Sequence, residues 1–157
     1  MEKIHNPFDN HCFGCSPNNI KGLKMEFFYD TEEKEVVTFW EPDSSYEGYP
    51  NVLHGGIQSL MADEIAAWSV YVLVETAGVT KNLTMDFQKP VFLHKGKISL
   101  RCRLKSTAKR SAVFEIELFD GESNLCTKGV AEYFIYPQQL ARKKFNYPGL
   151  SAFLPKK

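Results

Sequence analysis

A histidine followed by two glycines, His54, Gly55 and Gly56, stands where a stretch rich in turn residues passes into an apolar segment. Because glycine has no side chain to cover its backbone, the pair predicts bare N–H groups at a helix N-terminus. Such a terminus carries roughly half a positive elementary charge and suits an anion or a developing oxyanion. The pattern therefore indicates a place that polarises a carbonyl group, although a glycine pair serves a tight turn or close packing equally often.

Two carboxylates follow in the apolar segment, where hydrophobic residues recur at three- and four-residue steps and predict a helix over 57–75 that Gly78 ends. Asp63 comes nine positions after His54, which is ~13 Å at a rise of ~1.5 Å per residue. One helix cannot present both groups to one reacting atom. If Asp63 is catalytic, it must serve the N-terminus of a second copy of the helix, which predicts a two-fold dimer with two shared sites.

The adjacent carboxylates point in different directions on such a helix. Asp63 shares a stripe with Gly56 and Leu60, and Glu64 shares another with Trp68. We therefore expect only one of them to enter a site. The ordinary alternative for either acid is burial with satisfied hydrogen bonds, or a position at the solvent edge.

The elements that position these residues follow from alternating apolar patterns, which predict strands on both sides of the helix. The predicted strands are 23–29, 36–40, 80–90, 97–105, 111–119 and 126–136. The order is β-β-α-β-β-β-β, and a long buried helix among sequential strands favours an α+β fold with one antiparallel sheet curled around the helix. We expect one domain over 1–137, including an N-terminal loop, and a tail over 138–157 that packs loosely or is partly disordered.

The composition limits the kinds of molecule that the chain is expected to bind. The chain has 157 residues, with 19 basic and 19 acidic side chains that cancel. We therefore expect neither nucleic acid nor an anionic membrane as the main partner. The longest apolar run, 66–74, is shorter than the ~20 residues of a membrane span, and the first residues lack an apolar signal core, so cytoplasm is the expected location.

The cysteines are few for a chain of this length, so we expect them to be reduced. Cys12 and Cys15 form a CxxC pair with His11 beside it. No second pair at zinc-finger spacing follows, and the next residues predict a turn rather than the helix N-terminus of a redox site. We expect a structural loop here, with no metal and no cofactor.

The run from His54 to Glu64, HGGIQSLMADE, resembles the signature of hotdog-fold thioesterases of the phenylacetic-acid-pathway and 4-hydroxybenzoyl-CoA type. Residues 12–23 and 80–90 resemble the same family, so the likeness spans most of 12–136. It implies a hotdog fold, in which a curved antiparallel sheet of five to six strands wraps one long central helix. It also implies hydrolysis of an acyl-CoA to a carboxylic acid and coenzyme A by a homodimer or a dimer of dimers.

The resemblance assigns roles to residues of this chain. The backbone N–H of Gly55 would donate to the thioester carbonyl, with His54 supporting the substrate or the loop. Asp63 from the partner subunit would act as nucleophile or as a base toward water. Thr80 stands at the position where some relatives hold that water with a hydroxyl.

Further residues are candidates for contacts with the acyl-CoA. They are Asn51, Gly56, Gln58, Glu64, Trp68, Lys109 and Arg110. The two basic residues lie in a turn that suits the phosphates of coenzyme A, although ordinary solvated charges are as common there. Trp68 either limits the size of the acyl group or fills the core, and Gln58 either touches substrate or is solvated.

Two other functions are open. A hotdog hydratase or dehydratase also pairs a histidine with an acid from another subunit, but the two glycines after His54 argue against it. A non-catalytic acyl-CoA sensor is the other alternative. Hotdog sensors that control transcription carry an additional DNA-binding segment, for which we see no room before residue 20.

Overall fold

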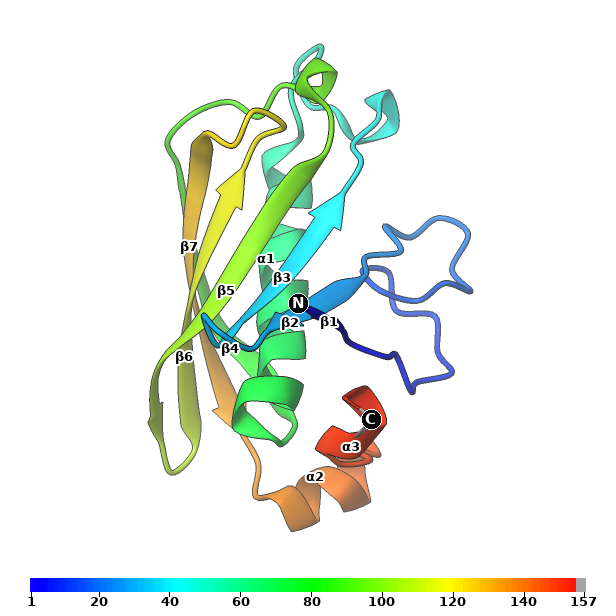
Figure 1. The fold of residues 1–157 in the computed structure, drawn as a ribbon, viewed down its shortest axis with the longest axis vertical. Coiled ribbons are helices and arrows are strands. Elements are labelled where there is room, and N and C mark those ends of the chain that lie inside the picture. Colours follow the sequence, from blue (N-terminus) through cyan, green and yellow to red (C-terminus); the bar gives the residue numbers. More distant parts are fainter. Residues whose placement is uncertain (155–157) are drawn as a thin grey trace.

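The structure is a computed structural model that describes residues 1–154. Its strands form one antiparallel sheet in the order β1-β2-β3-β5-β6-β7-β4 (Figure 1). The strands are β1 (Glu2–Lys3), β2 (Phe27–Asp30), β3 (Glu35–Trp40), β4 (Gly78–Phe87), β5 (Ile98–Ala108), β6 (Ser111–Phe119) and β7 (Leu125–Ile135). The predicted α+β hotdog architecture is confirmed. The seventh strand is β1, whose two residues are too few to produce a periodic pattern.

The central helix α1 (Gly55–Ser69) continues as a π-helical turn, η2 (Val70–Val74). It ends at Glu75, which adopts a left-handed conformation with φ of 56°, and not at Gly78, which begins β4. By length and composition alone, Gly55–Val74 is long and apolar enough to cross a membrane. Half of its most apolar window is nevertheless buried inside the protein, as the core helix of this fold requires.

The sheet curls around α1 (Figure 1). Along β5 and β6, buried side chains on the inner face alternate with more exposed ones on the outer face. Ile98, Leu100 and Cys102 on β5 are buried, as are Phe114 and Ile116 on β6. These side chains pack with the buried side of α1 in one hydrophobic core. The strand β4 follows the helix in sequence and forms one edge of the sheet, where it pairs with β7.

The C-terminal residues pack onto the end of the helix. They form α2 (Gln138–Phe145) and α3 (Leu150–Phe153), which lie beside η2 in Figure 1. Phe153 is fully buried and stacks on Tyr71 at a centroid distance of 5.2 Å, and the Tyr147 hydroxyl donates to the Tyr71 carbonyl at 3.1 Å. The prediction of a loose tail was wrong for 138–154, because isolated aromatics anchor it and leave no periodic signal. The remainder of that predicted tail, 155–157, lies outside the described residues.

The N-terminal loop between β1 and β2 reaches α1, where Cys12 and Gly14 lie against Glu64. Its backbone is pinned by hydrogen bonds from the Leu23 amide to the Phe13 carbonyl (2.8 Å) and from the Met25 amide to the Gly14 carbonyl (2.9 Å). The short 3-10 turn η1 (Ser44–Tyr46) precedes the stretch that leads into α1. A second one, η3 (Leu93–Lys95), follows β4 in the chain and is hydrogen-bonded to that stretch through Asn51.

Candidate active site

Asp63 lies near the middle of α1, half-buried where the helix meets the edge strand β4. Its Oδ1 accepts a hydrogen bond from the Thr80 hydroxyl at 2.7 Å and lies 2.6 Å from the Tyr133 hydroxyl. Within residues 1–154, no group donates to Oδ2. The carboxylate is therefore fixed through one oxygen while the other is left for a substrate or a water molecule.

Thr80 reaches the helix because β4 is irregular at this point. The pairing register between β4 and β7 shifts between Thr80 and Asn82, which marks a β-bulge at Lys81. Bulges increase the local twist and redirect a side chain, and they are common next to active sites. The structure thus brings together Asp63 and Thr80, which lie 17 positions apart in the sequence.

Tyr133 is a member of this group that the sequence reasoning missed. It lies on β7 opposite Thr80 and is almost completely buried, with its hydroxyl also 2.8 Å from the Asp63 backbone carbonyl. Burial, and then the hydrogen bond to Asp63, raise the pKa of Tyr133 far above its usual range, so the phenol stays protonated and donates. The available signal was a tyrosine at an inward position of a strand, since a buried phenol needs a hydrogen-bond partner.

The second predicted part of the site is the N-terminus of α1. His54 is the N-cap residue, and its Nδ1 accepts a hydrogen bond from the Gly56 amide at 2.8 Å. The expectation of two bare glycine amides is therefore wrong for Gly56, because the preceding imidazole caps it. The Gly55 amide has no acceptor within the described part of the chain and remains a free donor.

The glycine at position 56 leaves room for this cap. A Cβ atom there would lie 3.0 Å from His54 Nδ1, closer than side chains normally approach, whereas a Cβ at Gly55 would meet only the Phe87 ring at 3.5 Å. Two surface hollows flank His54, with volumes of about 490 and 280 Å³. Tyr49 and Val52 line the larger and Tyr46 and Ile57 the smaller.

The two parts of the site lie apart within one chain. Gly55 and Asp63 both belong to the helical segment Gly55–Ser69. Eight residues of α-helix separate them by about 12 Å. The geometric premise of the predicted dimer thus holds in the structure, since this chain by itself does not place the free amide beside the carboxylate.

Asn51 and Gln58 organise the loop that precedes the helix. Gln58 is buried, donating to the Leu53 carbonyl at 3.2 Å and accepting from the Thr127 hydroxyl at 2.6 Å. It is thus neither solvated nor turned toward a surface hollow, which corrects the expectation of a substrate contact. Asn51 adopts a left-handed conformation with φ of 64°, and its side-chain oxygen accepts from the His94 amide at 3.0 Å.

Glu64 and Trp68 lie on a different side of α1 from Asp63, as their helical spacing indicates. Trp68 donates its indole N–H to Glu64 Oε1 at 3.2 Å and stacks on Phe27 in the core. Burial raises the pKa of Glu64 to about 7. The Glu64 carboxylate lies under the N-terminal loop next to Cys12. Glu64 therefore contacts that loop and Trp68 packs in the core, and neither belongs to the Asp63 group.

Lys109 and Arg110 form the exposed turn between β5 and β6. The Arg110 carbonyl accepts from the Ile135 amide at 3.1 Å, which ties the turn to β7 two residues beyond Tyr133. Both residues are exposed, and neither belongs to β4 or β7, the strands that contact Asp63.

The sequence matches known proteins over the site. A family model described as the thioesterase superfamily matches residues 50–127. A Saccharolobus solfataricus protein named as a candidate esterase is 34% identical over 86 residues, covering 54% of this chain and 56% of its own length. An acyl-coenzyme A thioesterase of Xenopus laevis is 35% identical over 72 residues, covering 45% of this chain and 31% of its own. The chain thus spans about half or less of these relatives.

Solved structures share the fold at low sequence identity. A thioesterase of Streptococcus pneumoniae crystallised with coenzyme A has a TM-score of 0.61 and 19% identity, covering 66% of this chain and 82% of its own. The Escherichia coli PaaI protein of the phenylacetic acid degradation operon has a TM-score of 0.60 and 18% identity, covering 66% and 74%. These structures show the shared hotdog fold. The family-model match over residues 50–127, which contains His54, Asp63 and Thr80, places the chain in the thioesterase superfamily.

Proposed function

We propose that this protein hydrolyses an acyl-CoA thioester to a carboxylic acid and free coenzyme A. The observation that carries the proposal is the Asp63 carboxylate, held through Oδ1 by Thr80 and Tyr133 and open at Oδ2. A fixed carboxylate with one unengaged oxygen is suited to attack a carbonyl carbon or to take a proton from water. Thioesterase superfamily membership and the acyl-coenzyme A thioesterase among the relatives support the same substrate class.

We further propose that the working site is shared between two copies of the chain. The free Gly55 amide and the Asp63 carboxylate lie about 12 Å apart on one helix, so a single reaction centre needs one from each copy. The edge strand β4 has ten residues and carries exposed Val79 and Phe87. Such an edge is a template for pairing with another strand.

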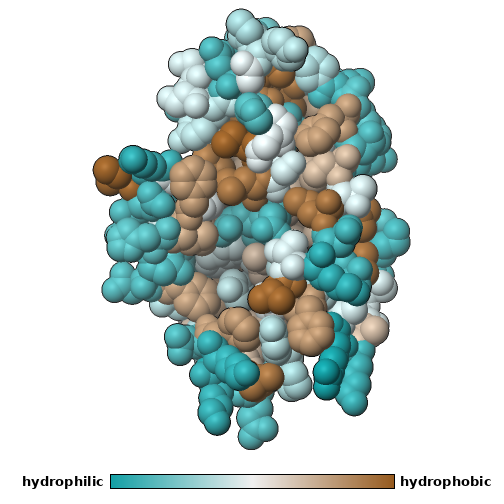
Figure 2. All heavy atoms as spheres, turned by 180° about the vertical axis from the view of Figure 1, so that it is seen from behind, coloured by the Kyte–Doolittle hydropathy of each residue, from teal (hydrophilic) through white to brown (hydrophobic). Residues whose placement is uncertain are grey.

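The surface also supports an assembly. On the side opposite to the view of Figure 1, many apolar residues are spread over the middle of the molecule with some hydrophilic ones among them, and hydrophilic residues line both sides (Figure 2). A second copy placed there would remove apolar surface from water. We propose a homodimer on this basis, with a dimer of dimers as the larger assembly.

The chemistry follows from the two groups. The Gly55 N–H, aided by the positive end of α1, would stabilise the negative charge that develops on the thioester oxygen. Asp63 either attacks the carbonyl carbon, giving a mixed anhydride that water then cleaves, or deprotonates the water that attacks. In both routes the C–S bond breaks, coenzyme A leaves as the thiolate and takes up a proton, and one water molecule is consumed.

The rest of the substrate has candidate contacts at the surface. The hollows beside His54 offer space for part of it, and the basic turn of Lys109 and Arg110 offers two positive charges to the phosphates of coenzyme A. Coenzyme A is present in the crystallised Streptococcus pneumoniae neighbour. We place the reaction in the cytoplasm, which agrees with four cysteines that are all free thiols.

The proposal is tested by following thiol release from short, long and aromatic acyl-CoA substrates with the purified protein. The expected result is turnover of at least one acyl class, abolished in Asp63→Asn. A folded protein that binds acyl-CoA tightly without releasing thiol would contradict hydrolysis and favour a sensor. Hydration of an enoyl thioester without thiol release would favour the hydratase alternative.

A further inference from the structure

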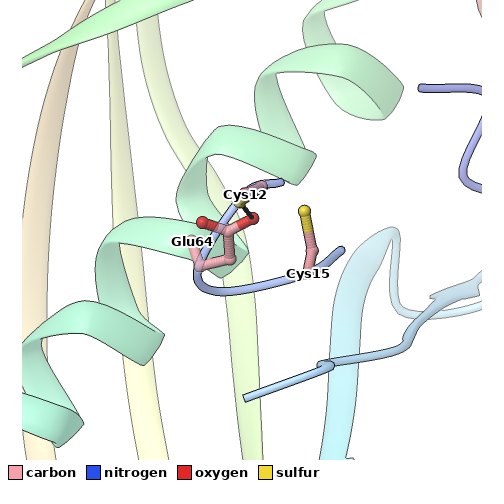
Figure 3. A group of neighbouring side chains, drawn as sticks. All are labelled: Cys12, Cys15 and Glu64. Carbon is pink, nitrogen blue, oxygen red and sulfur yellow. Dashed lines mark hydrogen bonds between the residues drawn. The ribbon is translucent and has the colours of Figure 1, made fainter. Parts of the chain in front are cut away.

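Three side chains that the proposed hydrolysis does not use come together beneath the N-terminal loop. Cys12 and Cys15 belong to the loop, and Glu64 belongs to α1 (Figure 3). One ligand atom from each lies within 4.8 Å of the other two, and Cys12 Sγ is 3.3 Å from Glu64 Oε1. Two sulfurs and a carboxylate oxygen thus face one small space between the loop and the helix.

The spacing is close to that of a metal site. With Zn–S of about 2.3 Å and Zn–O of about 2.0–2.2 Å, neighbouring ligand atoms around a tetrahedral zinc ion lie roughly 3.6–3.8 Å apart. The three atoms here already lie within 4.8 Å of one another. The three atoms would therefore have to approach one another by about 1.2 Å at most, a shift that side-chain torsions can supply.

The loop holds this arrangement by itself. Phe13 and Gly14, between the two cysteines, accept backbone hydrogen bonds from Leu23 and Met25, and the Ser16 amide donates to the Cys12 carbonyl at 3.1 Å. A Cβ atom at position 14 would lie 2.5 Å from the Glu64 carboxyl carbon, so the loop backbone lies directly against that carboxylate. The two thiols are consequently presented to Glu64 on a pre-formed turn.

Glu64 lacks a positive partner. Its Oε1 receives hydrogen bonds from the Trp68 indole and the Cys12 thiol, but no lysine, arginine or histidine within residues 1–154 forms a salt bridge with it. Glu64 is half-buried, and charges withdrawn from water are normally paired with an opposite charge or coordinate a metal. A divalent cation between Glu64 and the two sulfurs would supply that charge.

We propose that Cys12, Cys15 and Glu64 bind one Zn²⁺ ion. Thiolate sulfur selects soft or borderline metals, and a tetrahedral set of two sulfurs and one oxygen suits zinc. Cys12 is half-exposed, which leaves solvent as the fourth ligand. Binding converts both thiols to thiolates, and their two protons pass to solvent.

Such an ion would link the N-terminal loop to α1 through Glu64, the residue next to Asp63. It would act on the position of the loop and the stability of the fold, because Glu64 points to a different side of the helix from Asp63. This inference stands apart from the proposed hydrolysis, and its test uses no activity measurement.

The proposed site also revises the expectation, based on the single CxxC pair, that the chain binds no metal. That expectation could not include Glu64, which lies 52 positions from Cys12.

The test is zinc binding by the full-length protein under reducing conditions. Titration against a competing chelator and native mass spectrometry should give one zinc per chain, with a mass gain of one zinc less two protons. The Cys12→Ser and Cys15→Ser variants should each bind zinc more than roughly 100-fold more weakly, since loss of even an outer-shell partner costs 10–100-fold. Cys126→Ala, which removes a buried cysteine of β7, is the matched control and should bind as the wild type does.

Glu64→Gln tests the carboxylate separately, because it keeps the size of the side chain. It should weaken zinc binding by at least about tenfold, and unchanged affinity would overturn Glu64 as a ligand. Wild-type protein that binds no more zinc than the Cys12→Ser variant would overturn the site. If the cysteine variants do not fold, Co²⁺ in the wild-type protein decides the matter. Thiolate-to-cobalt charge-transfer absorption with tetrahedral visible bands would support the site, and their absence would refute it.

Discussion

The phenol oxygen of Tyr133, on β7, lies 2.6 Å from Oδ1 of Asp63 and 2.8 Å from the Asp63 backbone carbonyl. Thr80 donates to Oδ1 from β4. Two neighbouring strands therefore hold one carboxylate oxygen of the helix, and this arrangement leaves Oδ2 free for the proposed reaction.

Tyr133→Phe should lower kcat and leave KM nearly unchanged. The substitution keeps the buried ring and removes one hydrogen bond to a charged group, which is worth about 1.5–3 kcal/mol. If that bond orients Asp63 for reaction, kcat falls roughly 10- to 150-fold. Steady-state kinetics measures the change, with thermal unfolding to verify the fold.

The matched control is Tyr147→Phe, which removes another buried phenol hydroxyl, bonded to the Tyr71 carbonyl and not to Asp63. It should leave kcat within about twofold of wild type while costing a similar free energy of unfolding. Equal losses of kcat in the two variants would reduce Tyr133 to a structural residue.

Gly55→Pro should abolish most of the turnover. Proline removes the backbone N–H that is proposed to bind the thioester oxygen, yet it is favoured at the first helical position. The extended conformation of His54, with ψ of 133°, also suits the residue before a proline. We expect kcat to fall about 10²–10³-fold, as for loss of one oxyanion donor.

Gly55→Ala keeps the N–H and adds only a methyl group in ordinary contact with Phe87. It should therefore lose far less turnover than the proline variant. Similar losses in the two variants would show that bulk at position 55 matters and that the amide does not.

Val79→Lys should convert the proposed dimer to a monomer and remove turnover. Val79 is 42% exposed on the edge strand β4, and a charge on an edge strand opposes pairing. Val130→Lys is the control, because Val130 is 41% exposed but lies on β7, which has neighbours on both sides. Analytical ultracentrifugation of the three proteins measures the outcome. A wild-type monomer, or a dimer that survives the Val79 change, would contradict pairing through β4.

Phe153→Ala should destabilise the protein by about 3–5 kcal/mol, the usual cost of removing a fully buried phenylalanine. Its ring packs against Tyr71 and Trp68, so the C-terminal helices contribute to the core. Chemical denaturation measures this free energy, with the exposed Lys143→Ala expected to change it by less than about 0.5 kcal/mol. Equal midpoints for the two variants would mean that the C-terminal segment packs loosely after all.

Local patterns were enough to predict the central helix and the strands that surround it, because apolar periods of two and 3.6 residues record which face is buried. The placement of Asp63 and Glu64 on different sides of α1 followed from helical geometry in the same way. Thr80 entered only through family resemblance, as a position that holds water in some relatives. Its hydrogen bond to Asp63 was not predicted, since it depends on a β-bulge that no periodic pattern reveals.

Other contacts were beyond local reasoning. Tyr133 reaches Asp63 across 70 positions of sequence, and Gln58 reaches Thr127 across 69. Such polar pairs form because the sheet folds over the helix and each buried polar group needs a partner. Gly56 was expected to expose its amide, but the cap depends on the rotamer of the His54 ring. The buried aromatics of the C-terminal segment, spaced irregularly, left no period to detect.

The central claim is a site shared between two copies, and subunit mixing tests it most directly. Asp63→Asn and Gly55→Pro, each inactive alone, are co-expressed with different tags, and the doubly tagged dimers are isolated. Each mixed dimer holds one intact site and one with both defects, so the account predicts about half the wild-type activity per mixed dimer. Mixed dimers as inactive as either parent would contradict the shared site.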